Sequence, residues 1–542
     1  MKTWVMRTLR HMTTEDTAVA LFGATFFVGV WYALPMVNTI TDTWAFGGGV
    51  LRAMEAHTLL PGVGVDYGTL SFYQNYLAFV LALGFGYMLS GFDLEALKTV
   101  LILNPSYSLL VPRITSALTA IVLLVIVYRF LKVHVESAPW RLALLMLTFG
   151  NVLAVILTRS GKMWMLSTAL GVISFIYLYR AITEEVKTGP GRLSVTSILT
   201  AFLATANFPF AAVFLVNIPI LLYMLPRTYQ SVLRLSYAVL GGGAAFLIVF
   251  ALNATNIIDQ VSGFITQFLN PSADSVPKEG TLALFESFAV NIRQAIEAFP
   301  LLLLALIPAL RSGIRDKTLM YLSLIYIAVY IIALSYIFRT DHGLALNVRH
   351  IFPLCFFLLF LIAAWRPPSR SIAVSFLIVG ASIYVYTLVL LSIPTTYNAA
   401  TDFIESRYTD AVIRIDEHIW ELTLPMNKAS YGLFASSSCG STCQHVQELP
   451  RDIAFRPLVV TNETDPATLA TLPPPDILLV ERVIAECTPL ARFGNNVPDD
   501  EVFDIDINLG RMLLPSFYTL GRLGKNIYIY DVKECPGYAI PQ

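Results

Sequence analysis

Long apolar runs dominate this sequence and constrain its fold more than any other feature. A helix needs about 20 mostly apolar residues to cross a bilayer, and runs of about this length recur along the first 393 residues. Hydrophobic residues make up 56% of the chain and charged residues 13%, against about 25% charged residues in soluble domains. The sequence therefore predicts a polytopic α-helical membrane protein. Its net charge of −1 does not favour nucleic acid as a partner.

About eleven of these runs are predicted to cross the membrane. They are 17–37, 110–131, 141–158, 163–180, 194–207, 209–225, 235–252, 298–310, 319–338, 348–365 and 371–393. Lys2, Arg7 and Arg10 precede the first run, which is too long for a cleaved signal peptide. The N-terminus is therefore predicted to be cytoplasmic, in a multi-pass protein of the plasma or inner membrane.

Positive charge in the short loops sets the rest of the predicted topology. Lys- and Arg-rich loops favour the cytoplasm. The loops assigned there are 129–141, 180–192, 227–234, 311–317 and 366–370. The apolar run 70–91 breaks this alternation if it crosses. It is therefore predicted to lie along the outer surface or to dip in and return, as a juxtamembrane helix, and its aromatic and polar opening suits an interface.

The first outer loop, 38–109, contains candidates for acid–base chemistry. A hydroxyl that attacks an anomeric carbon must lose a proton, and a carboxylate within hydrogen-bond reach is the usual base. Asp42 is the first candidate and Asp66 is its rival. Three further residues are expected on the acceptor side: Glu55, His57 and Tyr67. Asp42 is equally well suited to cap a helix over 43–56, because Asp is favoured at the N-cap.

Five basic residues are predicted near the outer membrane plane. They are Arg113, Arg159, Lys162, Arg349 and His350. Arginine forks match phosphate oxygens and lysine supplies a point charge, so together they could hold a lipid-linked phosphate and stabilise it as a leaving group. The alternative is that each reaches towards lipid headgroups, as basic residues at helix ends commonly do.

Two short motifs within apolar stretches, one polar and one of glycines, are interpreted as structural features. Asn207 and Pro209 are interpreted as a turn between two short spans. The Gly241-Gly242-Gly243 run is not followed by a phosphate-loop lysine, and it predicts close packing of helices in the membrane.

The C-terminal region, 394–542, is predicted to be a small extracytoplasmic α/β domain. Segments 475–480 and 526–530 favour strands. The region contains Cys439, Cys443, Cys487 and Cys535, which could form two disulfides in an oxidising compartment. Cys439 and Cys443 could instead bind metal with His445, but no second matching pair follows. No metal site is predicted, and a divalent cation is possible but not indicated.

Several short motifs follow one another in a recognisable order along residues 1–393. Asp42 follows the first span. The others are Tyr67-Gly68-Thr69-Leu70-Ser71-Phe72-Tyr73, Arg113-Ile114-Thr115-Ser116-Ala117-Leu118, Thr158-Arg159-Ser160 and Val348-Arg349-His350-Ile351-Phe352-Pro353. This order resembles the GT-C superfamily of integral-membrane glycosyltransferases, with the protein O-mannosyltransferases and the lipid A aminoarabinose transferases as the nearest groups. Two positions depart from the family pattern: Thr43 follows Asp42 where an acid is common, and Lys162 stands near another common acid.

The resemblance implies a catalytic transmembrane module over residues 1–393. It implies a polyprenyl-phosphate sugar as donor, inverting transfer on the outer face, and a first-loop acid acting on the acceptor. Basic residues would hold the donor phosphate. The acceptor could be a glycan, a lipid or a protein. The alternative function is a transporter or lipid flippase without catalysis, which predicts internal repeats and charges at mid-membrane depth.

Overall fold

The computed structural model describes residues between 13 and 535. The ranges inside these limits that are not described are 33, 35–42, 62–67, 104–106, 186–188, 227, 259–280, 338–347, 409–410, 412, 416–457, 461–475, 481–482, 485–486, 495–523 and 525. The predictions for Asp42, Asp66 and Tyr67 therefore lie outside the described residues, as do those for Cys439 and Cys443.

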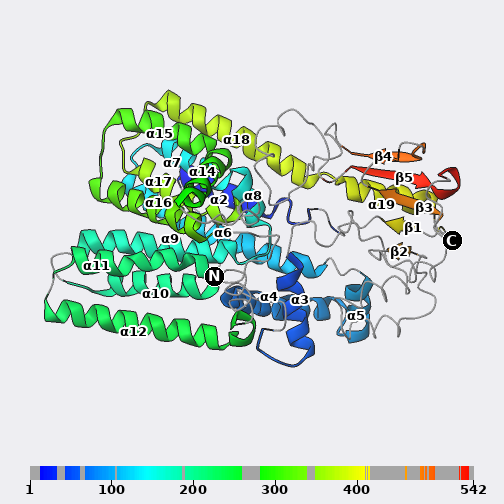
Figure 1. The fold of residues 1–542 in the computed structure, drawn as a ribbon, viewed down its shortest axis with the longest axis horizontal. Coiled ribbons are helices and arrows are strands. Elements are labelled where there is room, and N and C mark those ends of the chain that lie inside the picture. The colour runs from blue at the N-terminus through cyan, green and yellow to red at the C-terminus, as the bar shows by residue number, and fades with distance from the viewer. Residues whose placement is uncertain are drawn as a thin grey trace.

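A bundle of helices forms one end of the molecule and a small sheet forms the other (Figure 1). The bundle contains α2 (Thr14–Ala24), α6 (Tyr107–His134), α7 (Ala138–Phe149), α8 (Val152–Thr158), α9 (Trp164–Arg180), α10 (Arg192–Asn207), α11 (Asn217–Met224), α12 (Tyr229–Ala251), α14 (Thr281–Ala298), α15 (Pro300–Ser312), α16 (Lys317–Ile337), α17 (Leu354–Ala363) and α18 (Arg370–Ser392). Shorter 3₁₀ stretches are η1 (Thr25–Phe27), η3 (Pro209–Val216) and η4 (Val348–Ile351). The predicted, mostly helical fold with a small C-terminal sheet is confirmed.

Six helical segments among the described residues are long and apolar enough to cross a membrane, or up to eight if two bent helix pairs each count once. The six are Thr69–Leu89, Leu109–His134, Trp164–Glu185, Tyr229–Ala251, Lys317–Tyr336 and Arg370–Ile404. The bent pairs are α7–α8 and α14–α15, with bends of 66° and 86°. The prediction of about eleven crossings differs from this number for two reasons. α2, α10, α11 and α17 have only 11, 16, 8 and 10 residues, and α4, which is not among the predicted crossings, is one of the six.

The bundle interior contains a small cluster of hydrogen bonds, here called the Asn217 cluster. Asn217 Nδ2 donates to Ser174 Oγ and Ser197 Oγ, each at 2.7 Å. Asn217 Oδ1 accepts from the Tyr326 hydroxyl. The cluster joins α9, α10, α11 and α16, all of which bury these side chains. Interhelical hydrogen bonds of this kind help helices to associate where water offers no competition.

Removing the Asn217 amide should destabilise the bundle measurably. Asn217→Leu removes three hydrogen bonds at roughly 0.6 kcal/mol each and leaves the Tyr326 hydroxyl without its acceptor, at about 1 kcal/mol, so it should lower the unfolding free energy by about 3 kcal/mol. Tyr326→Phe removes one of these bonds and leaves Asn217 Oδ1 without this donor, so it should cost about half as much. Thermal unfolding in one detergent checks both variants, and equal losses would contradict a cluster centred on Asn217.

The basic loops that are predicted to be cytoplasmic lie together at one end of the bundle. The contacts that join them are Arg315 to the His134 carbonyl oxygen (2.6 Å), Tyr179 to Asp316 (2.5 Å), Arg234 to the Pro190 carbonyl oxygen (3.3 Å) and Arg141 to Glu15. Glu15 stands in the first turn of α2. These contacts gather the basic loops at one end of the bundle. The assignment of this end to the cytoplasm stays a prediction.

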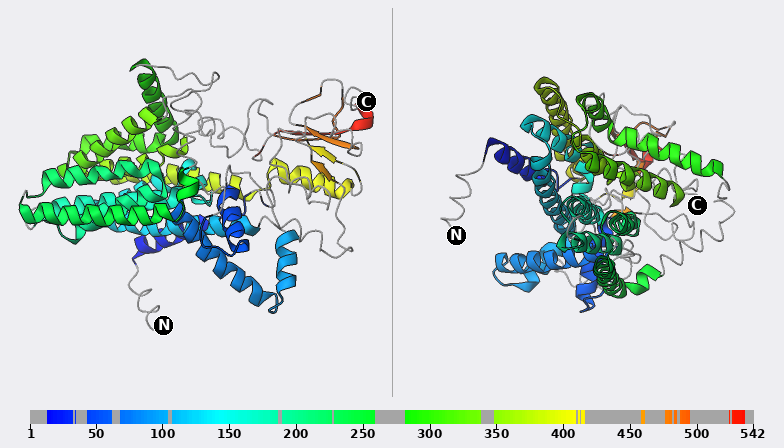
Figure 2. Two further views of the ribbon diagram at one scale, coloured as in Figure 1. Left: turned by 60° about the horizontal axis from the view of Figure 1, so that its bottom comes forward. Right: turned by 90° about the vertical axis from the view of Figure 1, so that its left-hand side faces the viewer.

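The segment 69–113 leaves the opposite end of the bundle and returns to it. Two helices follow one another there, α4 (Thr69–Leu89) and α5 (Leu94–Leu103), after α3 (Thr43–Glu55). At the start of α4, Ser71 N donates to Asn207 Oδ1 at 2.9 Å, and Asn207 also binds Ser167 in the first turn of α9. α4 slants away from the bundle, and α5 leaves its far end at a sharp angle (Figure 2). α4 is long and apolar enough to span, and the expectation that 70–91 does not cross stays a prediction.

The C-terminal sheet has five strands in the order β2-β1-β3-β5-β4. They are β1 (Ile413–Ile415), β2 (Leu458–Val460), β3 (Ile477–Val480), β4 (Ala491–Phe493) and β5 (Ile527–Asp531). β1 pairs in parallel with β2 and β3, and β5 runs antiparallel to β3 and β4. Helix α19 (Thr396–Arg407) covers one face through Tyr397, Ala400 and Ile404. Both predicted strands are confirmed, as β3 and β5.

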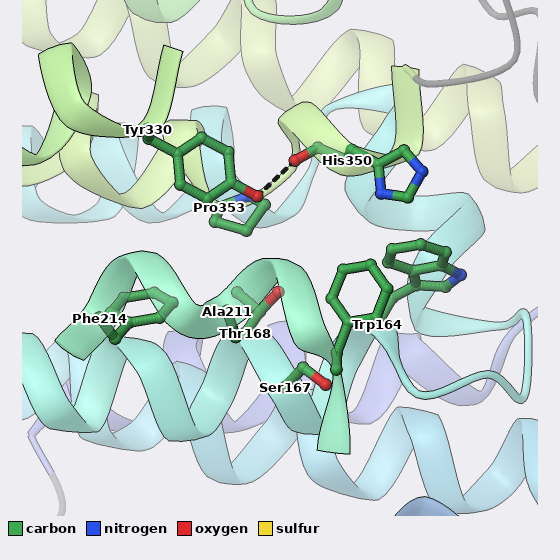
Figure 3. Close-up of a pocket in the computed structure, with 9 residues that line it drawn as sticks. Trp164, Ser167, Thr168, Ala211, Phe214, Tyr330, His350 and Pro353 are labelled. Atoms are coloured by element: carbon green, nitrogen blue, oxygen red, sulfur yellow. Dashed lines mark hydrogen bonds between the residues drawn. The ribbon is translucent and has the colours of Figure 1, made fainter. Parts of the chain in front are cut away.

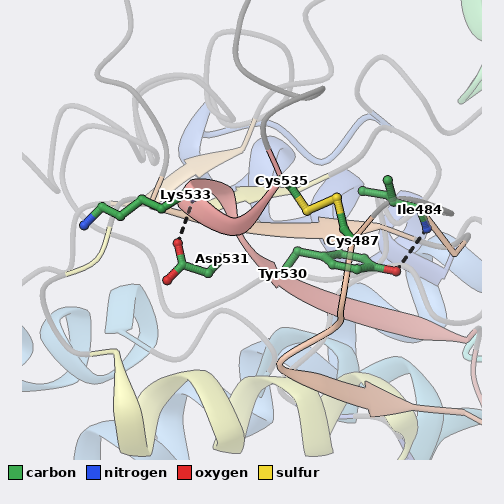
Figure 4. Close-up of a disulfide and its surroundings, with 6 residues drawn as sticks. All are labelled: Ile484, Cys487, Tyr530, Asp531, Lys533 and Cys535. Atoms are coloured by element: carbon green, nitrogen blue, oxygen red, sulfur yellow. Dashed lines mark hydrogen bonds between the residues drawn. A yellow bond between two sulfur atoms is a disulfide. The ribbon is translucent and has the colours of Figure 1, made fainter.

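A disulfide closes the other face of this sheet. Cys487 and Cys535 are bonded, and Cys535 packs with Tyr530 and Val480 (Figure 4). The Tyr530 hydroxyl accepts a hydrogen bond from the Ile484 backbone N–H at 3.0 Å. Two of the four candidate cysteines are therefore paired with each other.

Breaking this disulfide should destabilise the sheet without unfolding the bundle. The bond closes a segment of 48 residues, so Cys487→Ser should cost about 2–4 kcal/mol. Hydrogen exchange of the β3 and β5 amides measures the loss locally. A reducing agent should reproduce it in the natural chain and add nothing in the variant. An added loss in the variant would contradict this assignment of the stabilising bond.

Candidate functional site

The predicted first span unwinds before it reaches its expected end. α2 ends at Ala24, η1 follows to Phe27, and turns occupy residues 28–32 and Leu34. Gly29 has φ +82°, and a Cβ on it would lie 2.9 Å from Leu391 Cβ, so glycine allows both the backbone conformation and the close approach of α18. The unwound backbone exposes carbonyl groups that an intact helix would satisfy internally.

Arg159 satisfies these carbonyl groups. Its Nε donates to the Val28 carbonyl oxygen at 2.6 Å, and Nη2 donates to that of Thr25 at 3.0 Å. Its Nη1 donates to the Val155 carbonyl oxygen at 2.8 Å. Burial lowers the pKa of this guanidinium from its ordinary value, although arginine stays charged at neutral pH. In this structure Arg159 therefore holds the chain that leads towards Asp42.

Arg113 binds the next part of the same segment. Its Nη1 donates to the carbonyl oxygens of Val30 and Tyr32, at 2.9 Å and 2.7 Å. The side chain is 1% exposed, and its Nε and Nη2 have no hydrogen-bond partner among the described residues. A buried guanidinium with unsatisfied N–H groups favours an anion nearby, because burial removes the water that would otherwise solvate the positive charge.

A glycine turn brings α9 and its basic residues against Arg113. Gly161 has φ +70°, and a Cβ there would lie 2.9 Å from Pro112 Cβ and 3.2 Å from Arg113 N. Lys162 follows directly and is buried, and α9 begins at Trp164. The Thr158-Arg159-Ser160 turn and the start of α6 are therefore neighbours. Arg113 and Arg159, which these two segments carry, are both predicted to lie near the outer membrane plane.

Trp164 is the centre of a second group of basic residues. The Arg349 guanidinium lies 5.2 Å from the centroid of its ring, a cation–π distance. The His350 ring lies 4.9 Å from the same ring, edge to face. Lys162 is buried and stands two residues before Trp164, at the start of α9. The structure thus brings Lys162, Arg349 and His350 together, and these three residues are called the basic cluster below.

A partly open pocket adjoins the basic cluster (Figure 3). It is small, with a cavity volume of about 10 Å³, which is room for about one water molecule. Its lining residues are Trp164, Ser167, Thr168, Phe208, Ala211, Phe214, Tyr330, His350 and Pro353. The Tyr330 hydroxyl donates to the His350 carbonyl oxygen at 2.6 Å and so fixes the turn that carries the basic residues of η4.

Asn207 has a larger role than the turn that its sequence context indicates. It is fully buried, and its Nδ2 donates to Ser71 Oγ at 3.1 Å and to Ser167 Oγ at 2.7 Å. It thereby ties the start of α4, which follows Asp66 and Tyr67 in sequence, to the start of α9. The only signal in the sequence was an amide before a proline in an apolar stretch.

The predicted acceptor-side residues that the structure describes are exposed. Glu55 ends α3, and His57 follows in a turn with φ 50°. α3 begins one residue after Asp42, so the helix expected over 43–56 is confirmed. In the described part of the chain, no group of three or more His, Cys, Asp or Glu side chains could hold a metal ion.

The C-terminal domain contacts the unwound segment directly. Asn398 Nδ2, in the first turn of α19, donates to the Leu34 carbonyl oxygen at 2.9 Å. Leu34 is the last described residue before the stretch that contains Asp42.

Comparison of the chain with protein-family models, with curated proteins and with solved structures finds no match.

Proposed function

We propose that this protein is an inverting glycosyltransferase that uses a polyprenyl-phosphate sugar as donor on the outer face of the membrane. The observation that carries the proposal is the gathering of Lys162, Arg349 and His350 around Trp164, beside the buried Arg113. Several donors that converge on one place can neutralise a phosphate as it leaves a sugar.

The chain near this group also supports a carboxylate close to the phosphate. Arg113, Arg159 and Asn398 hold the backbone between Thr25 and Leu34. Asp42 lies eight positions after Leu34 and directly before Thr43, the first residue of α3, and in this proposal it faces the basic cluster.

In the proposed reaction, Asp42 removes the proton from an acceptor hydroxyl. The hydroxyl oxygen attacks the anomeric carbon from the side opposite the phosphate, and the bond from that carbon to the phosphate oxygen breaks. The configuration at this carbon is inverted, and the lipid phosphate departs with the bonding electrons. Lys162, Arg349 and His350 stabilise the charge that develops on it. Asp66 is the rival base, because it directly precedes the segment that Asn207 anchors.

Two features support the proposed outer position of the site. The Cys487–Cys535 disulfide is of a kind that persists in oxidising compartments. The basic loops lie at the opposite end of the bundle, as expected for the cytoplasmic side. We place α4 and α5 at the outer membrane surface, since the segment begins and ends beside the basic cluster.

Purified protein in proteoliposomes tests the proposal. With a polyprenyl-phosphate sugar and a membrane extract that supplies acceptors, we expect free polyprenyl phosphate and a glycosylated product of inverted anomeric configuration. A transporter or flippase would instead move the lipid between leaflets and leave the bond between sugar and phosphate intact. That result would overturn the proposed function.

A further inference from the structure

The hydroxyl of Thr168 lines the pocket beside Trp164 instead of bonding to its own helix. A threonine inside a helix can donate to the carbonyl oxygen four residues earlier, as Thr115, Thr158 and Thr387 do at 2.7, 2.6 and 2.9 Å. Thr168 is 3% exposed, and its side chain has no hydrogen-bond partner among the described residues. Because a buried hydroxyl without a partner is unfavourable, this position favours a ligand that forms hydrogen bonds.

Two further hydroxyl groups line the same pocket, and each can make one more hydrogen bond. Ser167 Oγ accepts from Asn207 Nδ2 at 2.7 Å, so its own proton is available to a further acceptor. The Tyr330 hydroxyl donates to the His350 carbonyl oxygen at 2.6 Å, so its oxygen can still accept. Ser167 and Thr168 come from α9 and Tyr330 comes from α16, on opposite sides of the pocket (Figure 3). A ligand between them therefore joins the two helices.

The size and the charge of the pocket define this ligand. A volume of about 10 Å³ admits about one water molecule and excludes a phosphate, a sugar or a hydrocarbon chain. A buried water molecule needs about two to four polar partners, and the three hydroxyl groups meet this need. A metal cation of similar size is disfavoured, because the hydroxyl groups supply no negative charge and the basic cluster lies beside the pocket.

We propose that the pocket holds one ordered water molecule, which bridges the hydroxyl groups of Thr168 and Tyr330. The water donates to the Tyr330 oxygen, and Tyr330 donates to the carbonyl oxygen of His350. Each bond in such a chain polarises the next and strengthens it. The water site thereby fixes the backbone of η4, which carries Arg349 and His350, and Thr168 is a positioning residue for the basic cluster. The inference goes beyond the proposed function, since the water site needs no donor.

Hydrogen exchange of the full-length protein in detergent, without donor, tests this proposal. Phe352 N–H donates to the Arg349 carbonyl oxygen at 3.3 Å, so the exchange of this amide reports on the η4 turn. Thr168→Val keeps the shape of the side chain and removes its hydroxyl, so the Phe352 amide should exchange about fivefold faster or more. Thr168→Ser restores a hydroxyl and should restore most of the protection. Thr387→Val is the matched control, because the Thr387 hydroxyl bonds to its own helix α18, and it should leave the rate unchanged.

A structure of the natural chain that resolves ordered waters gives the direct check. The expected result is one water within about 3.2 Å of both Thr168 Oγ1 and Tyr330 Oη. A direct hydrogen bond between these two side chains, or a pocket that holds no water, would overturn the proposal. It would also fail if Thr168→Val left the exchange of the Phe352 amide unchanged, or if Thr168→Ser or Thr387→Val accelerated it as much as Thr168→Val does. None of these outcomes bears on the phosphate site, which donor binding to Arg349→Gln tests separately.

Discussion

Asp42→Asn should lower the rate of sugar transfer by about 100- to 10,000-fold, the range expected when a general base is removed. Asparagine is nearly isosteric with aspartate but cannot take the proton from the acceptor. It is also about as good as aspartate at a helix N-cap. The substitution therefore separates the two interpretations of Asp42, because it removes a base while it preserves a cap of α3. Initial rates with saturating donor and acceptor measure the effect.

Two control variants sharpen this prediction. Asp66→Asn should lower the rate by no more than a few-fold if Asp42 is the base, and the opposite ranking would assign the proton transfer to Asp66. Asp42→Ala removes base and cap together, so it should add a stability loss of about 1 kcal/mol that Asp42→Asn lacks. An Asp42→Asn protein that is stable and fully active would leave Asp42 with a capping role alone.

The features that follow from composition and periodicity are well predicted by the sequence. Apolar length predicts α6, α9, α12, α16 and α18, because the bilayer selects helices by hydropathy. Alternating aromatic and β-branched residues predict β5. The Gly241-Gly242-Gly243 run predicts close packing, and a Cβ on Gly242 would indeed lie 2.3 Å from the Phe202 ring. Each of these signals is local in the chain.

The features that depend on long-range partners are not predictable in this way. The run 17–37 has the hydropathy of one unbroken span. Its unwinding after Ala24 depends on the arginine forks of α6 and of the turn before α9, which donate to its carbonyl groups. Arg159 and Arg349 are indistinguishable as basic residues at span ends. Only the fold shows that one guanidinium is occupied by backbone carbonyls and the other lies over an aromatic ring.

This difference predicts opposite behaviour for two substitutions of the same residue type. Arg349→Gln should reduce the affinity for the lipid-phosphate donor by about 10- to 100-fold, since a charge-assisted hydrogen bond to phosphate contributes roughly 1.5–3 kcal/mol. Loss of its cation–π contact with Trp164 should cost about 0.5–1 kcal/mol of stability, less than the loss expected for Arg159. The dependence of the initial rate on donor concentration should show the loss in kcat/KM. Higher salt should lower the donor affinity of the natural chain towards that of the variant.

Arg159→Met should instead destabilise the fold. Three carbonyl groups lose their donor, and at about 1 kcal/mol or more for each unsatisfied buried group the loss should reach at least about 3 kcal/mol. Thermal unfolding measures this loss, and the fraction that remains folded should keep most of its affinity for donor. If Arg159→Met is as stable as the natural chain and Arg349→Gln is not, the two roles are reversed. In that case the donor phosphate would compete with the carbonyl groups of Thr25 and Val28 for the Arg159 guanidinium. Donor binding would then release the segment that leads to Asp42.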